Sequence, residues 1–308
     1  MKYYAVLFAA TLAGAQSVSS TYLTDLNGNR VPAGSVVATD GKHTETRQSI
    51  NGRTVPLEQS DEKVLSETPS SRVTEKIVRK FDPDGHLVST ERVLTEEQKR
   101  PTGSLVNTTT FVSDVNGAMH QEERKTIETD KHGATTNTNT VVERPTLNGF
   151  ETVEKRAEVS QTSGDTTHSD ETVYRVSQSG GFYPAIRKVT ETTQSATQTV
   201  EKTALYEPRG NVDTMQLSRQ TVSTTTTRPD GSSVDQINYY GAAVPGNVRD
   251  PNAAPQLYEQ DVIERKPGAG GTVTESLTAR RASMADPGHL GAPIKISETV
   301  CTGKCSDK

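Results

Sequence analysis

Three short segments combine carboxylate and amide side chains with a glycine, the residue types that could hold a calcium ion. They are Asp25-Leu-Asn-Gly28, Asp82-Pro-Asp-Gly85 and Asp114-Val-Asn-Gly117. A calcium loop of the EF-hand type needs further oxygen ligands and a bidentate Glu at its twelfth position, and the full spacing is missing from all three segments. Asp, Asn and Gly are also the residues that tight turns require. The sequence therefore predicts turns here, with no metal and no cofactor.

Aromatic side chains could stack on a ligand, and they are concentrated at Phe182-Tyr183 and Tyr239-Tyr240. The chain contains no Trp, the residue that most often makes a stacking platform for sugars. These four residues are the candidate ligand surface, and packing within the fold is the alternative.

Catalytic motifs are missing from the sequence. It contains no Gly-x-Ser-x-Gly elbow, no P-loop, no His-Glu-x-x-His helix and no dinucleotide fingerprint. The sequence therefore names no catalytic residue and predicts that the chain is not an enzyme; a secreted hydrolase is the remaining enzymatic alternative.

The elements that must position these residues follow a regular period. Turn-like clusters mark the chain every 14–18 residues between Gly85 and Gly210, and Thr- and Val-rich stretches lie between them. Such a period is typical of one strand and one turn, repeated. We expect an all-β fold, a long antiparallel β-meander of about 16-residue strand–turn repeats. The meander is either a twisted extended sheet or rolled into a sandwich or barrel.

Composition limits how such a sheet can be stabilised. Only 31% of the residues are hydrophobic, and the net charge is −5 with both signs interleaved. The core is therefore expected to be thin, and edge strands could self-associate to bury more surface. No basic block is present, so nucleic acid is not expected as a partner.

The chain divides into four expected regions. Residues 1–15 are predicted to be a signal peptide, because Lys2 precedes an apolar run that ends in Ala13-Gly14-Ala15. Residues 16–72 form an N-terminal β-hairpin region, and residues 73–240 form the β-meander array. Residues 241–308 contain a linker, a terminal hairpin and a C-terminal tail.

The two cysteines lie in that tail, at Cys301 and Cys305. Two cysteines in an exported chain are expected to pair, and the small loop would clip the C-terminus locally. A crosslink between chains and a metal site are the alternatives, and a metal would need further ligands besides two thiolates.

These observations predict a secreted protein, extracellular or periplasmic, with no transmembrane segment. Strands as polar as residues 135–140 are not expected to supply the apolar outer face of a membrane barrel. The leading hypothesis is an exported, non-enzymatic structural or adhesive repeat protein of the cell surface or extracellular matrix. The alternative is a secreted β-module that binds a glycan or another extracellular ligand.

Overall fold

The fold is taken from a computed structural model that describes residues 16–25, 28–39, 42–209, 211–241, 255–283 and 286–303. The predicted signal peptide and most of the predicted linker lie outside these residues. The described part of the chain contains no helix with the length and apolarity needed to span a bilayer.

The described residues form 19 β-strands and one short 3₁₀ turn, η1 (Ala269–Gly271). The strands are β1 (Gln16–Thr24), β2 (Arg30–Thr39), β3 (His43–Ile50), β4 (Arg53–Glu67), β5 (Ser71–Phe81), β6 (Leu87–Arg100), β7 (Gly103–Ser113), β8 (Met119–His132), β9 (Thr135–Thr146), β10 (Gly149–Ser163), β11 (Thr166–Val176), β12 (Phe182–Gln194), β13 (Gln198–Arg209), β14 (Asn211–Thr227), β15 (Ser233–Gly241), β16 (Gln256–Pro267), β17 (Val273–Ser283), β18 (Asp286–Leu290) and β19 (Ile294–Gly303).

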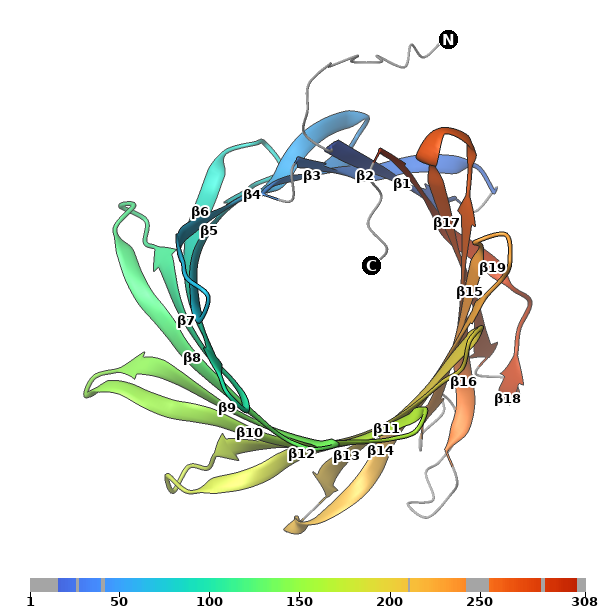
Figure 1. Cartoon of the computed structure of the whole chain (residues 1–308). Helices are drawn as coiled ribbons and strands as arrows, with labels where there is room; N and C mark the ends of the chain where they lie inside the picture. Colours follow the sequence, from blue (N-terminus) through green and yellow to red (C-terminus); the bar gives the residue numbers. More distant parts are fainter. Residues whose placement is uncertain are drawn as a thin grey trace.

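The strands form a closed barrel, seen end-on as a ring in Figure 1. Each ring strand pairs antiparallel with its neighbours in sequence, except that β17 pairs with β19, and β19 pairs with β1 to close the ring. The short β18 pairs with β17 and is not one of the 18 ring strands. The predicted all-β antiparallel meander is confirmed, and of the expected forms it takes the barrel.

Closure corrects the expectation that edge strands recruit further chains. Ser19 of β1 lies opposite Val36 of β2 on one side and opposite Cys301 of β19 on the other. Every described ring strand has a partner on both sides, so the ring has no unpaired edge of the kind that templates self-association.

The turns follow the predicted markers. Gly85 and Gly117 have φ of 87° and 81°, a conformation that glycine adopts without the steric cost of a Cβ. Within the predicted N-terminal β-hairpin region, residues 58–67 belong to β4.

The barrel has two rims. The termini rim holds the start of β1, the end of β19 and turns such as those at residues 101–102 and 133–134. The far rim holds the other set of turns, including those at residues 82–86, 114–118, 147–148 and 177–181.

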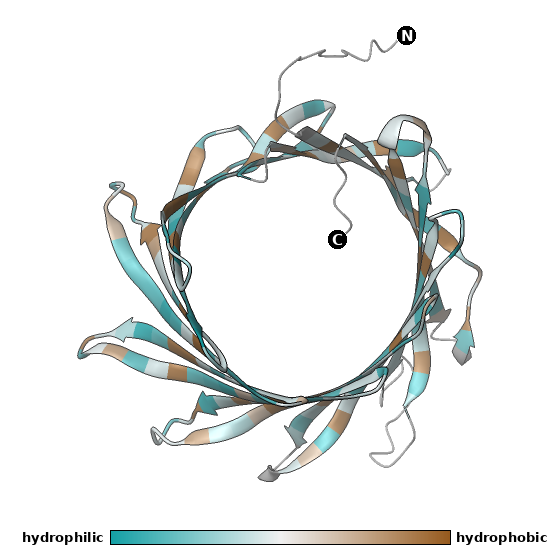
Figure 2. Cartoon of the chain, in the orientation of Figure 1, coloured by the Kyte–Doolittle hydropathy of each residue, from teal (hydrophilic) through white to brown (hydrophobic). Residues whose placement is uncertain are grey.

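The wall has two faces, because successive residues of a strand point to opposite sides and directly paired residues share a side. Following the strand registers round the ring assigns Arg92, Phe111 and Arg124 to one face. Val142 and Arg156 belong to the other face. Figure 2 shows hydrophilic and hydrophobic residues alternating along the strands all round the ring.

Backbone geometry indicates which face is outward. The N–H of Thr90 donates toward β7, to Ser113 Oγ (2.9 Å), whereas the N–H of Lys99 donates toward β5, to the Ser70 carbonyl (2.8 Å). From β6 to β8, residues paired across the sheet also lie progressively farther from the termini-rim ends of their strands. The strands of a barrel always tilt in the same direction relative to its axis. For L-residues these facts place the face of Thr90 and Arg92 outside, and the face of Lys99 and Arg156 inside.

Burial agrees with this assignment. The buried side chains of the inner face are Ser60, Val78, Thr140, Val142, Val173 and Ala279, whereas Glu75 is the buried side chain of the outer face among the described strand residues. Side chains converge on the concave side of a curved sheet and screen one another from water. The thin core expected from composition is therefore a layer along the inner wall.

Candidate functional site

The inner wall is the candidate functional site, and a recess on it spans β8 to β11. The recess has a volume of about 540 Å³. Its charged lining residues come from four neighbouring strands and are Glu123, Lys125, Arg144, Glu154, Arg156 and Arg175. The alternation of each strand brings these side chains to one face, although they are far apart in sequence.

Ion pairs order these charges. Arg144 Nη2 lies 3.2 Å from Glu123 Oε2, and Arg156 Nη2 lies 2.7 Å from Glu154 Oε1. Arg175 Nε lies 3.6 Å from the second oxygen of Glu154. All three guanidinium groups keep about half of their side-chain surface exposed. The recess is therefore a hydrated, mixed-charge surface that can bind water and ions.

The outer wall holds charges as well, in tighter pairs. Glu75 lies between Lys63 Nζ (2.7 Å) and Arg92 Nε (2.6 Å), and its side chain is only 7% exposed. Asp61 lies between His43 and Arg79, each at 2.7 Å. The outer face is therefore not a continuous apolar band, and the charges of these two clusters are compensated at short range.

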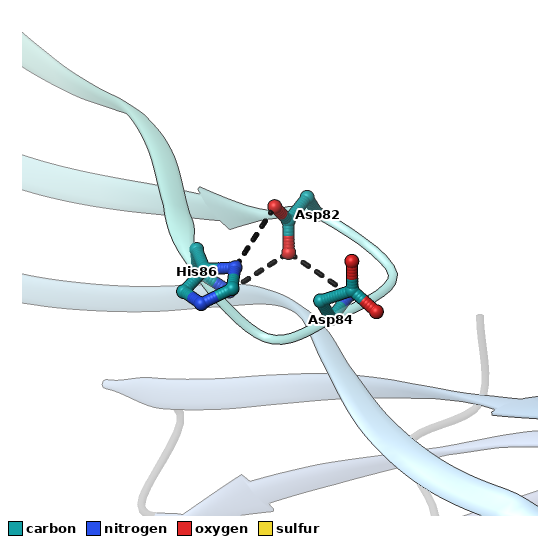
Figure 3. Close-up of side chains that lie close together, drawn as sticks. All are labelled: Asp82, Asp84 and His86. Atoms are coloured by element: carbon teal, nitrogen blue, oxygen red, sulfur yellow. Dashed lines mark hydrogen bonds and ion pairs between the residues drawn. The ribbon is translucent and has the colours of Figure 1, made fainter.

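Two of the calcium-like segments, at residues 82–85 and 114–117, are turns at the far rim. Leu26 and Asn27 of the third segment lie outside the described residues. Figure 3 shows Asp82, Asp84 and His86 of the turn between β5 and β6. Asp82 Oδ1 accepts hydrogen bonds from the backbone N–H groups of Asp84 (2.9 Å) and His86 (2.8 Å). Asp82 Oδ2 lies 3.2 Å from His86 Nδ1. Each oxygen of the Asp82 carboxylate therefore lies within hydrogen-bond distance of a donor in the same turn.

The next far-rim turn repeats this arrangement. Asp114 Oδ1 accepts from the N–H groups of Asn116 (2.8 Å) and Ala118 (2.9 Å), and its other oxygen lies 3.0 Å from His120 Nε2. His120 and the backbone donors hold the pKa of the Asp114 carboxyl below its usual range. Backbone donation from His86 does the same for the pKa of Asp82. In both turns the aspartate side chain accepts hydrogen bonds from backbone N–H groups of the same turn, so its role is to cap that turn.

The four residues of the candidate ligand surface lie on opposite faces of the barrel wall. Phe182 and Tyr240 lie on the outer face, whereas Tyr183 and Tyr239 lie on the inner face. Tyr239 contacts Tyr258, with ring centroids 6.4 Å apart. The structure therefore does not bring the four predicted residues together, and a ligand role for them stays a prediction.

Cys301 lies in β19, opposite Ser19 of β1 and Val273 of β17. Cys305 lies outside the described residues, so the predicted pairing of the two cysteines stays a prediction.

Comparison with solved structures finds barrels of the same shape. Two mutants of the Rh. blastica porin match with TM-scores of 0.52 and 0.51, each at 7% sequence identity. Each match covers 94% of this chain and 98% of that chain. No protein-family model matches the chain, and no curated protein matches it. At this identity the likeness shows the fold, a large closed porin-type barrel.

This finding corrects the functional predictions. The chain is not an open, extended sheet that presents surface, so the prediction of a structural or adhesive repeat protein is wrong. The alternative prediction, a secreted glycan-binding module, is wrong as well. The predicted secreted location without a transmembrane segment is overturned by the same fold. The error came from requiring an apolar strand face, whereas this wall pairs its charges across strands.

Proposed function

We propose that the chain forms a water-filled pore across an outer membrane, through which ions and small hydrophilic solutes pass. The observation that carries this proposal is the closure of 18 strands into one ring. Barrels of about eight strands fill their interior with side chains, whereas barrels of 16–18 strands leave an aqueous channel.

The inner wall supports this proposal. Its recess carries both signs of charge on half-exposed side chains, and such a surface keeps a channel hydrated and acts on passing ions. The name porin, given to the two structures with this fold, is further support.

The outer wall must then tolerate lipid. An unpaired Arg or Lys on the lipid face of a barrel costs about 2–4 kcal/mol at the bilayer midplane. On this barrel Arg92 and Lys63 share the carboxylate of Glu75. Such pairing lowers the cost, because each charge is solvated by its partner.

A pore requires no catalytic group, so the proposal includes that the chain is not an enzyme. Turnover of sugar, ester or peptide substrates by the purified barrel would contradict this part.

Conductance tests the pore directly. The folded chain, refolded in detergent, is added to a planar lipid bilayer in potassium chloride, and the current is recorded at fixed voltage. We expect discrete, long-lived steps of equal size whose current is proportional to voltage. The same sample after complete unfolding serves as the control and should give no steps. A barrel shown to be folded by its β-sheet circular dichroism, yet without conductance in any bilayer, would overturn the proposal.

A further inference from the structure

Asparagine followed by glycine is the dipeptide in which an asparagine side chain reacts most readily with its own backbone, because glycine leaves the next backbone nitrogen unhindered. The chain contains four such dipeptides, Asn27-Gly28, Asn51-Gly52, Asn116-Gly117 and Asn148-Gly149. The last three fall within the described residues, and each lies at a turn of the far rim. The three turns differ in what holds them closed.

Hydrogen bonds hold the turns at Asn116 and Asn148. The N–H of Gly117 donates to the Asp114 carbonyl (3.0 Å), so the nitrogen that would react is already engaged. The N–H of Asn116 also donates to the side chain of Asp114 (2.8 Å). In the other turn, Thr146 Oγ1 accepts from the N–H of Asn148 (3.3 Å) and donates to the carbonyl of the glycine that follows (2.9 Å). Both asparagines must lose these bonds before their backbone can rearrange.

The turn at Asn51 has no such hold. Within the described chain, residues 49–53 form no side-chain hydrogen bond, and the N–H of Gly52 donates to no acceptor. Both residues of the turn are exposed, and their φ angles are 49° and 77°. Asn51 is the one described residue other than glycine with a positive φ. A side chain makes this conformation unfavourable, so Asn51 is relieved of a steric cost when the turn opens.

This turn also lies at the tip of a hairpin that extends beyond the wall. β2 pairs with β3 only as far as Gln48, and β5 pairs with β4 only from Glu58. The tip between them is paired only with itself, through pairs such as Ile50 with Arg53. A two-stranded hairpin alone is marginally stable in water, so the tip can open while the ring stays closed. The Asn148 tip extends in the same way, and its Thr146 cap makes the difference.

We propose that Asn51 is a site of spontaneous deamidation, at which the folded chain forms aspartate and isoaspartate. The backbone nitrogen of Gly52 gives up its proton and attacks Cγ of Asn51. A new C–N bond forms, the Cγ–Nδ2 bond breaks, and the side-chain nitrogen leaves as ammonia. The succinimide ring then adds one water molecule at either carbonyl and opens. The reaction consumes one water and releases one ammonia for each asparagine converted.

The products change the rim locally. Isoaspartate carries the main chain through the side chain, so one more backbone atom enters a two-residue turn whose length sets the register of Ile50 and Arg53. Both products add a carboxylate two residues from Arg53, which forms no ion pair with any described residue. The strand pairs that close the ring lie outside this tip, so the barrel itself should remain folded.

Peptide mapping of the full-length folded chain tests the site. The chain is kept at mildly alkaline pH, digested at acidic pH and analysed by mass spectrometry, with synthetic peptides that contain aspartate or isoaspartate at position 51 as standards. We expect Asn51 to convert about tenfold faster than Asn116 or Asn148, because the other two turns must first lose hydrogen bonds. In concentrated urea the three sites should convert at similar rates. The measurement does not require conductance, so this site and the proposed pore fail separately.

Variants of the two capped turns supply matched controls. Asp114→Ala should speed conversion at Asn116, and Thr146→Ala should speed conversion at Asn148, whereas the rate at Asn51 should stay the same in both. Asn51→Gln should remove the product at this turn, because the longer side chain cyclises far more slowly. Equal rates at the three sites in the folded chain would overturn the proposal. So would cap variants that remain folded by circular dichroism and convert no faster at their own turn.

Discussion

The inner and outer faces of this barrel are built from adjacent residues, yet they use different chemistry. The inner face buries Val78, Val142 and Val173 and lines a mixed-charge recess. The outer face has one buried strand residue among those described, Glu75, and it carries cation–π contacts. The comparison shows that curvature, rather than hydrophobicity alone, decides which face is packed.

This difference can be tested with neighbouring residues, because a step of one position changes the face and leaves the strand the same. Each variant below is therefore paired with a variant at an adjacent position.

The largest effect is expected at Gly103, where the outer face has no room for a side chain. A Cβ at this position would lie 1.7 Å from the Thr129 carbonyl oxygen of the neighbouring strand. Gly103→Val must push two backbones apart, and we expect a loss of about 2–3 kcal/mol in the free energy of unfolding. Ser104→Val, on the inner face, should change stability by less than about 0.5 kcal/mol. Denaturant unfolding measures both, and equal losses would contradict the face assignment.

The second test compares two valines of β9. Val142 is 7% exposed on the inner face, whereas Val141 is only half-buried on the outer face. Val142→Ala removes two buried methyl groups and should cost about 1.5–2 kcal/mol, and Val141→Ala about half of that. Unfolding in urea gives both values. A larger loss at Val141 would show that the outer face is the packed one.

Local patterns in the sequence predicted the strands and turns. The period of about 16 residues and markers such as Gly85 and Gly117 rest on the backbone freedom of glycine, which acts within a few residues. Closure could not be predicted in this way. It requires β1 to pair with β19, so that Ser19 lies opposite Cys301, and no local pattern selects one distant partner over another.

The candidate site shows a different limit. Strand alternation was available from the sequence, and applied to Phe182-Tyr183 it separates the two rings onto opposite faces. The recess could not be found, because Glu123, Arg144 and Arg175 converge only through strand registers. Their ordinary residue types and wide spacing left no signal in the sequence.

A third test uses Lys155 and Arg156, which point to opposite sides of β10. A unit charge in water acts on an ion about 8 Å away with roughly 0.5 kcal/mol. Salt at about 0.1 M screens this energy to roughly half, and Arg156→Glu changes the charge by two units with opposite effects on cations and anions. The variant should therefore shift the permeability ratio of a conducting pore toward cations by roughly fivefold, whereas Lys155→Glu should not. Reversal potentials across a salt gradient measure this ratio. An equal shift from both variants would show that selectivity does not depend on the inner wall.

The smallest effect is expected at the far-rim turns, which belong to neither face. Because the pKa of Asp114 is lowered in the folded chain, its contribution to stability is present above the ordinary aspartate value of about 3.9 and is lost as pH falls through the folded pKa. Hydrogen exchange at Asn116 and Ala118, compared at matched intrinsic rates, should therefore show protection at pH 6 that weakens below about pH 4. Asp114→Asn should weaken protection at pH 6 and remove most of its pH dependence, whereas Val115→Thr, in the same turn, should keep it. A pH dependence that survives Asp114→Asn would show that another group controls this turn.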